Sequence, residues 1–156
     1  MNAAMKIIHS WLSLKTWIKV WLIWLNLVLL GALFFLHDPL GLWTLVSLPV
    51  TFVFLVWIAV RQGGLVRLLG VGHLIPWIPL LIYLELRLFG EGVGPQIIFT
   101  ADSRLFIWAV TLWATLAICL AFDAYDVVRW FRGERFVLGT RAAADAGASK
   151  LAPKLG

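Results

Sequence analysis

The amino-acid sequence predicts an all-α polytopic membrane protein, a four-transmembrane-helix antiparallel bundle with an N-terminal interfacial helix and a cytoplasmic extension of its fourth helix. Hydrophobic residues make up 62% of the 156 residues and charged residues 13%, a balance outside the range of soluble domains. Four uncharged stretches carry this hydrophobicity, at residues 20–36, 39–60, 68–84 and 105–122. A hydrocarbon core about 30 Å thick requires roughly 17 to 20 helical residues. We therefore expect each stretch to cross the membrane.

The segment before the first span, residues 1–19, has the pattern of a helix that lies in the membrane interface. Large apolar residues recur in it at helical spacing, and three lysines accompany them, as in amphipathic interfacial helices. The first span is too long for a signal peptide, whose apolar region has about 7–15 residues. His37, Asp38 and Pro39 follow this span, where a signal peptide would have a small-residue cleavage site.

The first two loops between the spans are short, and the third is longer. Asp38 and the proline after it have the residue types of an N-cap and a first helical position, so the first outer loop has only a few residues. Residues 61–67 form an equally short inner loop. The second outer loop, residues 85–104, contains three glycines and a proline, which interrupt helices. Asp102 or Ser103 is then placed to cap the fourth span.

The distribution of lysine and arginine predicts the orientation in the membrane. Eleven of the 13 basic residues would lie on one side, which the positive-inside rule makes the cytoplasmic side. Both termini are then cytoplasmic. Residues 140–156 lack apolar periodicity and predict a disordered basic tail, attached to a transmembrane domain of residues 1–139. Because no soluble basic face exists, we expect no nucleic-acid partner.

Ionisable residues gather where the third span begins and the fourth span ends. His73 lies about one turn into the third span, and Asp123 and Asp126 lie at the end of the fourth, within the segment FDAYDVVRWFRGER. Arg67 and Arg129 are expected at the same depth. These five residues form the candidate polar cluster, since ionisable side chains in a membrane are costly and either pair with one another or mark functional sites.

Three interpretations of this cluster stay open. In the structural one, Asp126 pairs with Arg129 three residues later on the same helix, and His73 bridges to Asp123 and so holds the third and fourth spans together. In the second, the cluster relays protons or ions. In the third, it forms a docking surface for a partner protein.

Several residues inside the spans are expected to bend or pack the helices. Pro76 and Pro79 each remove a backbone donor and clash with the preceding turn, so we expect them to kink the third span beside His73. Hydroxyl-bearing residues follow one face of the second and fourth spans, where they let helices approach closely and bond to one another. They are Thr44, Ser47, Thr51, Thr111 and Thr115. The ten tryptophans suit aromatic belts at both interfaces.

We expect neither a cofactor nor a metal. A haem held by two histidines needs both at matched depth, and His73 is the only histidine inside a predicted span. His73, Asp123 and Asp126 supply three metal ligands at most. Cys119, the single cysteine, excludes a CxxC centre and needs no special role as a small buried residue. P-loop, GxSxG and HExxH motifs are lacking, so we do not expect an enzyme.

Two motifs resemble those of a group of small bacterial inner-membrane proteins with four predicted spans. The third span matches Gly-x-x-His-Leu, Trp-x-Pro-Leu and Tyr-Leu through Gly70, His73, Leu74, Trp77, Pro79, Leu80, Tyr83 and Leu84. The exit of the fourth span matches Phe-Asp-x-x-Asp-Val-x-Arg and Gly-Glu-Arg through Phe122, Asp123, Asp126, Val127, Arg129, Gly133, Glu134 and Arg135. The resemblance implies a bacterial inner membrane and the four-span fold, and it implies no activity.

These observations favour a non-catalytic accessory or scaffold subunit of an inner-membrane complex. It would dock membrane-protein partners through its lipid-facing helices and its charged cytoplasmic extension. The alternative is a small proton-coupled transporter or carrier that uses His73, Asp123 and Asp126, because proline-broken helices often frame substrate sites. A third hypothesis, a membrane enzyme that acts on lipid or quinone, depends on the same three residues. Membrane lipid is the other expected partner, and homo-oligomer formation is left open.

Overall fold

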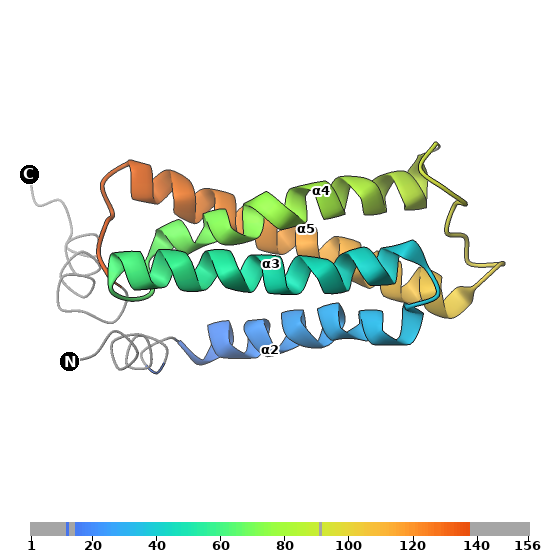
Figure 1. Ribbon diagram of the computed structural model, residues 1–156, viewed down its shortest axis with the longest axis horizontal. Coiled ribbons are helices and arrows are strands. Elements are labelled where there is room, and N and C mark those ends of the chain that lie inside the picture. Colours follow the sequence, from blue (N-terminus) through green and yellow to red (C-terminus); the bar gives the residue numbers. More distant parts are fainter. Residues whose placement is uncertain (1–11, 13–14, 91, 138–156) are drawn as a thin grey trace, which may run out of the picture.

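The computed structural model describes residues 12, 15–90 and 92–137, and the ordered elements of this part of the chain are all helices. Four long helices run back and forth along the long axis of the molecule (Figure 1). They are α2 (Thr16–Leu30), α3 (Pro39–Gln62), α4 (Gly70–Phe89) and α5 (Ser103–Phe131). Two short 3-10 helices extend them, η1 (Gly31–Phe35) after α2 and η2 (Arg67–Leu69) before α4. The predicted all-α fold is confirmed.

Four segments are long and apolar enough to cross a membrane: Thr16–Phe35, Pro39–Gln62, Arg67–Phe89 and Ser103–Phe131. The chain is thus a multi-pass membrane protein by the length and composition of its helices. The fourth segment continues helically past the predicted apolar span 105–122 to Phe131. Of the predicted interfacial segment, residues 1–19, only residues 12 and 15–19 are described, and residues 16–19 already belong to α2. The predicted basic tail, residues 140–156, lies outside the described residues.

Two of the helices, α3 and α5, begin at the capping residues that the sequence indicates. The Oδ1 atom of Asp38 accepts a hydrogen bond from Leu40 N at 2.8 Å, with Pro39 at the first helical position of α3. The Oδ1 atom of Asp102 accepts from Arg104 N and Leu105 N, both at 3.0 Å, at the start of α5. Each cap contributes roughly 1 kcal/mol to helix stability.

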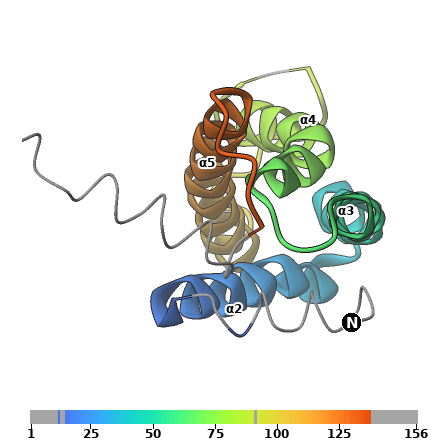
Figure 2. The same cartoon turned by 90° about the vertical axis from the view of Figure 1, so that its left-hand side faces the viewer.

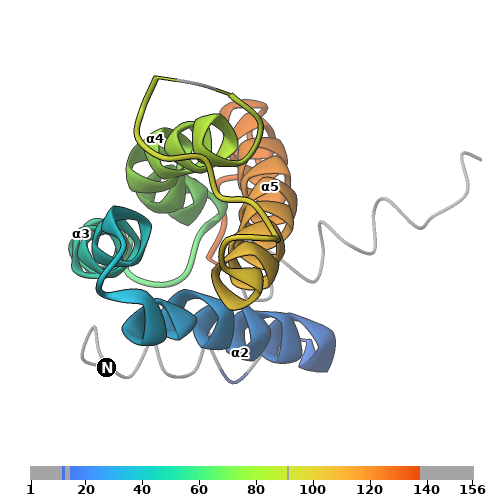
Figure 3. The ribbon, with the colours of Figure 1, turned by 90° about the vertical axis from the view of Figure 1, so that its right-hand side faces the viewer.

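Viewed from its two ends, the bundle has α4 and α5 side by side, α3 beside α4, and α2 lying obliquely across α5 and α3 (Figures 2 and 3). The main core lies between these helices and is aliphatic at its centre. Its largest fully buried apolar side chains are Leu29, Leu40, Leu84, Leu112 and Leu116, each 1% exposed or less. Because α5 supplies more of the core than any other helix, it is the element against which the others are positioned.

The hydroxyl groups of α3 form hydrogen bonds within their own helix, whereas the sequence predicts bonds between helices. Thr44, Ser47 and Thr51 are buried, but each donates its hydroxyl hydrogen bond to a carbonyl three or four residues earlier in α3. Their hydroxyl donors are therefore satisfied within α3. The small side chains leave a face on which another helix can pack closely. Thr115 of α5 does bond between helices, since its hydroxyl accepts from Trp24 Nε1 of α2 at 3.3 Å.

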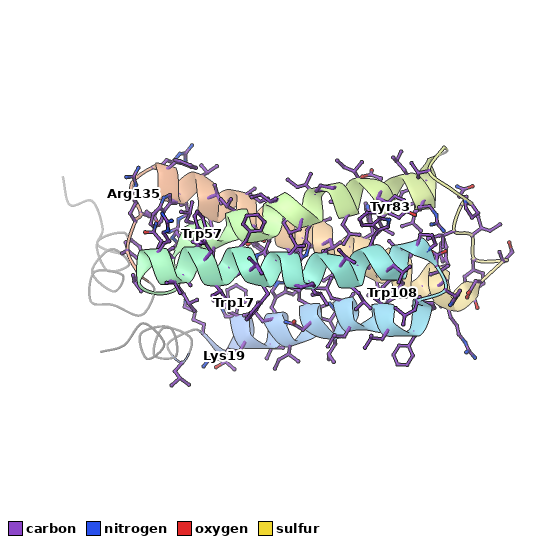
Figure 4. All side chains as sticks on the ribbon, viewed as in Figure 1. Trp17, Lys19, Trp57, Tyr83, Trp108 and Arg135 are labelled. Carbon is purple, nitrogen blue, oxygen red and sulfur yellow. The ribbon has the colours of Figure 1, made fainter. Side chains whose placement is uncertain are left out.

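Large apolar side chains cover the outside of the bundle, as expected of a protein whose solvent is lipid. Figure 4 shows Trp17 and Trp57 toward the end that carries Arg135, and Trp108 toward the opposite end with Tyr83. Trp17 and Trp57 are exposed, which suits an interfacial belt. Trp108 is instead buried, donates to Val28 O at 2.9 Å and stacks on Phe35, so it serves packing between α2 and α5.

Candidate functional site

The candidate site lies at the end of the bundle where α4 begins and α5 leaves the span, hereafter the basic end. Gly70, the first residue of α4, lies against the backbone of Asp123 in α5. A Cβ at Gly70 would come within 2.8 Å of the Asp123 carbonyl oxygen, which is closer than Cβ atoms approach backbone, and within 3.1 Å of its Cα. Glycine is therefore required for the two helices to approach this closely, which gives the glycine of the Gly-x-x-His motif a physical reason.

Three residues after this crossing, His73 reaches Asp123. Its Nδ1 atom lies 3.1 Å from Asp123 Oδ2, and the two side chains are 16% and 17% exposed. The contact is not a hydrogen bond, because Nδ1 is buried without a hydrogen-bond partner among the described residues. The imidazole stacks on the indole of Trp77, with 4.5 Å between ring centroids and 17° between planes. This stacking holds the imidazole in place.

Cys119 lies beside His73 and Asp123, whereas the sequence predicts only a small buried residue with no special role. The Cys119 thiol donates to Asp123 Oδ2 at 3.5 Å from one turn earlier in α5. The ligand atoms of His73, Cys119 and Asp123 all lie within 4.8 Å of one another. We call these three residues the His–Cys–Asp cluster. The sequence already places Cys119 and Asp123 on one face of the fourth span, four residues apart, and this face was predicted to serve helix packing.

The other predicted residues form a separate ion-pair network. Arg67 pairs with Asp126, and its Nε lies 3.1 Å from Glu134 Oε2. Arg129 Nη2 also contacts Glu134 Oε2, at 2.6 Å. Asp126 and Arg129 thus take partners other than each other, which differs from the predicted pairing along α5. Glu134 was missing from the candidate cluster, and it takes part because the chain turns back at Gly133, whose φ of 105° favours glycine.

The opposite end of the bundle, hereafter the loop end, holds a second buried charge that sequence reasoning missed. Arg87 of α4 is 2% exposed. Its Nη2 donates to Asp38 Oδ2 at 2.8 Å and its Nη1 to Asp38 Oδ1 at 3.3 Å and to Tyr83 Oη at 2.9 Å. Its Nε donates to the carbonyl of Pro95 at 2.8 Å. The guanidinium therefore ties the start of α3, the end of α4 and the second outer loop together.

Two hollows lie beside α3 and α4. An apolar groove of about 500 Å³ is lined by residues that include Trp43, Val46, Pro76, Pro79 and Tyr83. A second cavity of about 230 Å³ is lined from α2, α3 and α4, and its polar lining is Asn26, Thr51, His73 and Trp77. A water molecule takes up about 30 Å³, so the second cavity has room for several. His73 thus belongs to the His–Cys–Asp cluster and also lines a partly polar cavity.

The helix α4 is continuous through Pro76 and Pro79, and the kink predicted there stays a prediction. Comparisons with protein-family models, curated proteins and solved structures gave no match. The resemblance of the two motifs to a group of bacterial inner-membrane proteins therefore also stays a prediction. What the residues of the site can do chemically is pair charges, hold a proton or bind a cation.

Proposed function

We propose that the protein is a non-catalytic accessory or scaffold subunit of a complex in a bacterial cytoplasmic membrane, with both termini in the cytoplasm. One observation carries this proposal: each residue of the candidate polar cluster lies within salt-bridge distance of a partner inside the chain. Arg67 and Arg129 have Asp126 and Glu134, and His73 has Asp123. Charges that are already paired act first as connections between helices, since an unpaired charge in this position would be costly.

The two ends of the bundle are fastened by different devices. At the basic end, Arg67 connects the α3–α4 loop to the extension of α5. At the loop end, Arg87 connects α3, α4 and the second outer loop. A bundle fastened at both ends is a rigid frame, which suits a subunit that positions a partner.

The partner surface we assign is the apolar groove between α3 and α4. Val46, Ser47 and Val50 of α3 and the two prolines of α4 are among the residues that line it. Small side chains allow close approach of a further transmembrane helix, which in lipid is held mainly by van der Waals packing. The occupant we propose is therefore a transmembrane helix of a partner subunit.

The test fills this groove without disturbing the core. Val46 is 53% exposed and lines the groove, whereas Val53 is 65% exposed on the same helix and does not line it. The protein is captured in mild detergent from its own membrane, as wild type, Val46→Trp and Val53→Trp. We expect wild type and Val53→Trp to retain the same membrane protein and Val46→Trp to lose it. Equal retention by both variants, or no reproducible partner of wild type, would contradict the proposal.

A small proton-coupled carrier is the second candidate, because His73 contacts both Asp123 and the partly polar cavity. A relay needs an ionisable group that reaches water or a polar cavity within the membrane. The test is proton flux through liposomes that contain the purified protein, compared between wild type, His73→Ala and Asp123→Asn. Flux that depends on both residues supports the carrier, and flux equal to that of empty liposomes rejects it.

A further inference from the structure

We propose that the His–Cys–Asp cluster binds a divalent transition-metal ion of the zinc class. This goes beyond the proposed function, which requires no metal. The cluster brings an imidazole, a thiol and a carboxylate from two helices to within 4.8 Å of one another. These are the three side-chain types that bind zinc in proteins, whereas calcium and magnesium take oxygen ligands. Asp126, expected beside them, is occupied by Arg67.

Two of the three separations between the ligand atoms are near those of a loaded site, and the third is within 4.8 Å. Cys119 Sγ lies 3.5 Å from Asp123 Oδ2, and His73 Nδ1 lies 3.1 Å from the same oxygen. Ligands that sit 2.0 to 2.3 Å from a tetrahedral ion are about 3.3 to 3.8 Å apart. The Nδ1 atom is buried without a hydrogen-bond partner among the described residues, although a carboxylate oxygen is within reach. Two ligands of one metal ion also lie close together without a hydrogen bond between them, as Nδ1 of His73 and Oδ2 of Asp123 do here.

The surrounding residues hold the ligands in this arrangement. The close crossing at Gly70 sets the distance between α4 and α5, and Trp77 stacks on the imidazole. Cys119 and Asp123 project from one face of α5 because they are four residues apart. Such fixed orientation of ligands is what raises metal affinity at protein sites.

Charge also favours the ion. On binding, Cys119 would release its thiol proton to the solvent and coordinate as a thiolate, with Asp123 as a carboxylate and His73 as a neutral imidazole. The two negative charges balance a divalent ion, so the loaded site carries no net charge in a medium of low dielectric constant. Three protein ligands leave one coordination position of a tetrahedral ion for water or another small ligand.

The experiment uses the full-length protein, purified in mild detergent, treated with a chelator and titrated with Co²⁺ as a spectroscopic substitute for Zn²⁺. We expect a thiolate-to-cobalt charge-transfer band that saturates at one ion per chain and disappears when Zn²⁺ is added. Cys119→Ser should abolish the band, and His73→Ala and Asp123→Asn should weaken Co²⁺ binding at least about tenfold. His37→Gln, at a histidine outside the cluster, is the matched control and should keep both the band and the affinity.

The absence of a charge-transfer band in the wild-type protein would overturn the proposal. Cys119 is the only cysteine of the chain, so this wild-type measurement decides the matter even if a variant fails to fold. Affinities that are unchanged in His73→Ala and Asp123→Asn would overturn it as well. Either result would leave the groove and its capture experiment unaffected, because that test does not involve the metal.

Discussion

Replacing Arg87 with methionine should destabilise the bundle strongly. The substitution keeps most of the side-chain volume but removes the guanidinium, which is 2% exposed and donates to Asp38, Tyr83 and the Pro95 carbonyl. The carboxylate of Asp38, 12% exposed, would then have no cationic partner. Removing one member of a buried ion pair costs about 3–5 kcal/mol of the free energy of unfolding. We therefore expect Arg87→Met to lose an amount in this range.

The complementary variant separates the ion pair from the helix cap. Asn caps helices as well as Asp does, so Asp38→Asn should keep the cap of α3 and lose only the charge. The double variant Asp38→Asn/Arg87→Met leaves no unpaired charge, so its cost should be below the sum of the two single costs by about 1–3 kcal/mol. Arg104→Met, at an exposed arginine of α5, is the control and should change stability by about 0.5 kcal/mol or less.

The assay is unfolding in mixed micelles of increasing denaturing detergent, followed by the circular dichroism of the helices. Two results would refute the reasoning. One is a loss of less than about 1 kcal/mol in Arg87→Met, which is the size expected of an exposed ion pair. The other is strict additivity of the two single variants, which would mean that Arg87 and Asp38 do not depend on each other.

Three further predictions concern the basic end and the orientation. Gly70→Ala should lower the free energy of unfolding by about 1–3 kcal/mol, because its methyl group would meet the backbone of α5; an unchanged detergent midpoint would contradict this. Arg67→Gln should speed trypsin cleavage after Arg132, because it releases the exit of α5, whereas Arg61→Gln, at an exposed arginine, should not. In a cysteine-free background, a membrane-impermeant maleimide should label Val93→Cys in intact cells and Arg132→Cys only after permeabilisation, and the reverse order would overturn the predicted orientation.

The spans, their approximate ends and their caps could be predicted because these features depend on local sequence. Hydrophobicity over about 20 residues decides whether a helix can cross a membrane, and Asp38 and Asp102 cap the helices that directly follow them. The continuation of α5 to Phe131 followed from the lack of a proline or glycine before Gly133. The bounds differ by a few residues, since charged and aromatic residues at helix ends extend beyond the uncharged stretches.

The candidate site could be predicted only in part. The sequence indicated which ionisable residues lie at the basic end, and the structure places His73 beside Asp123. It did not indicate that Asp126 pairs with Arg67 or that Cys119 joins the cluster. Along one helix, several partners three or four residues apart are equally near, so the choice between them depends on what the neighbouring helix presents.

The sequence by itself therefore determined the helical class of the protein, its four apolar segments long enough to cross a membrane, and which polar residues lie near the ends of these segments. Tertiary structure alone decided which of these residues meet. Arg87 and Asp38 are 49 residues apart and Arg67 and Asp126 are 59 apart, and no periodicity within a helix relates them. The physical reason is that such contacts depend on how each helix is rotated about its axis and how closely it crosses its neighbour. The distance between two helices is set at positions such as Gly70, where the absence of a side chain lets α4 approach α5.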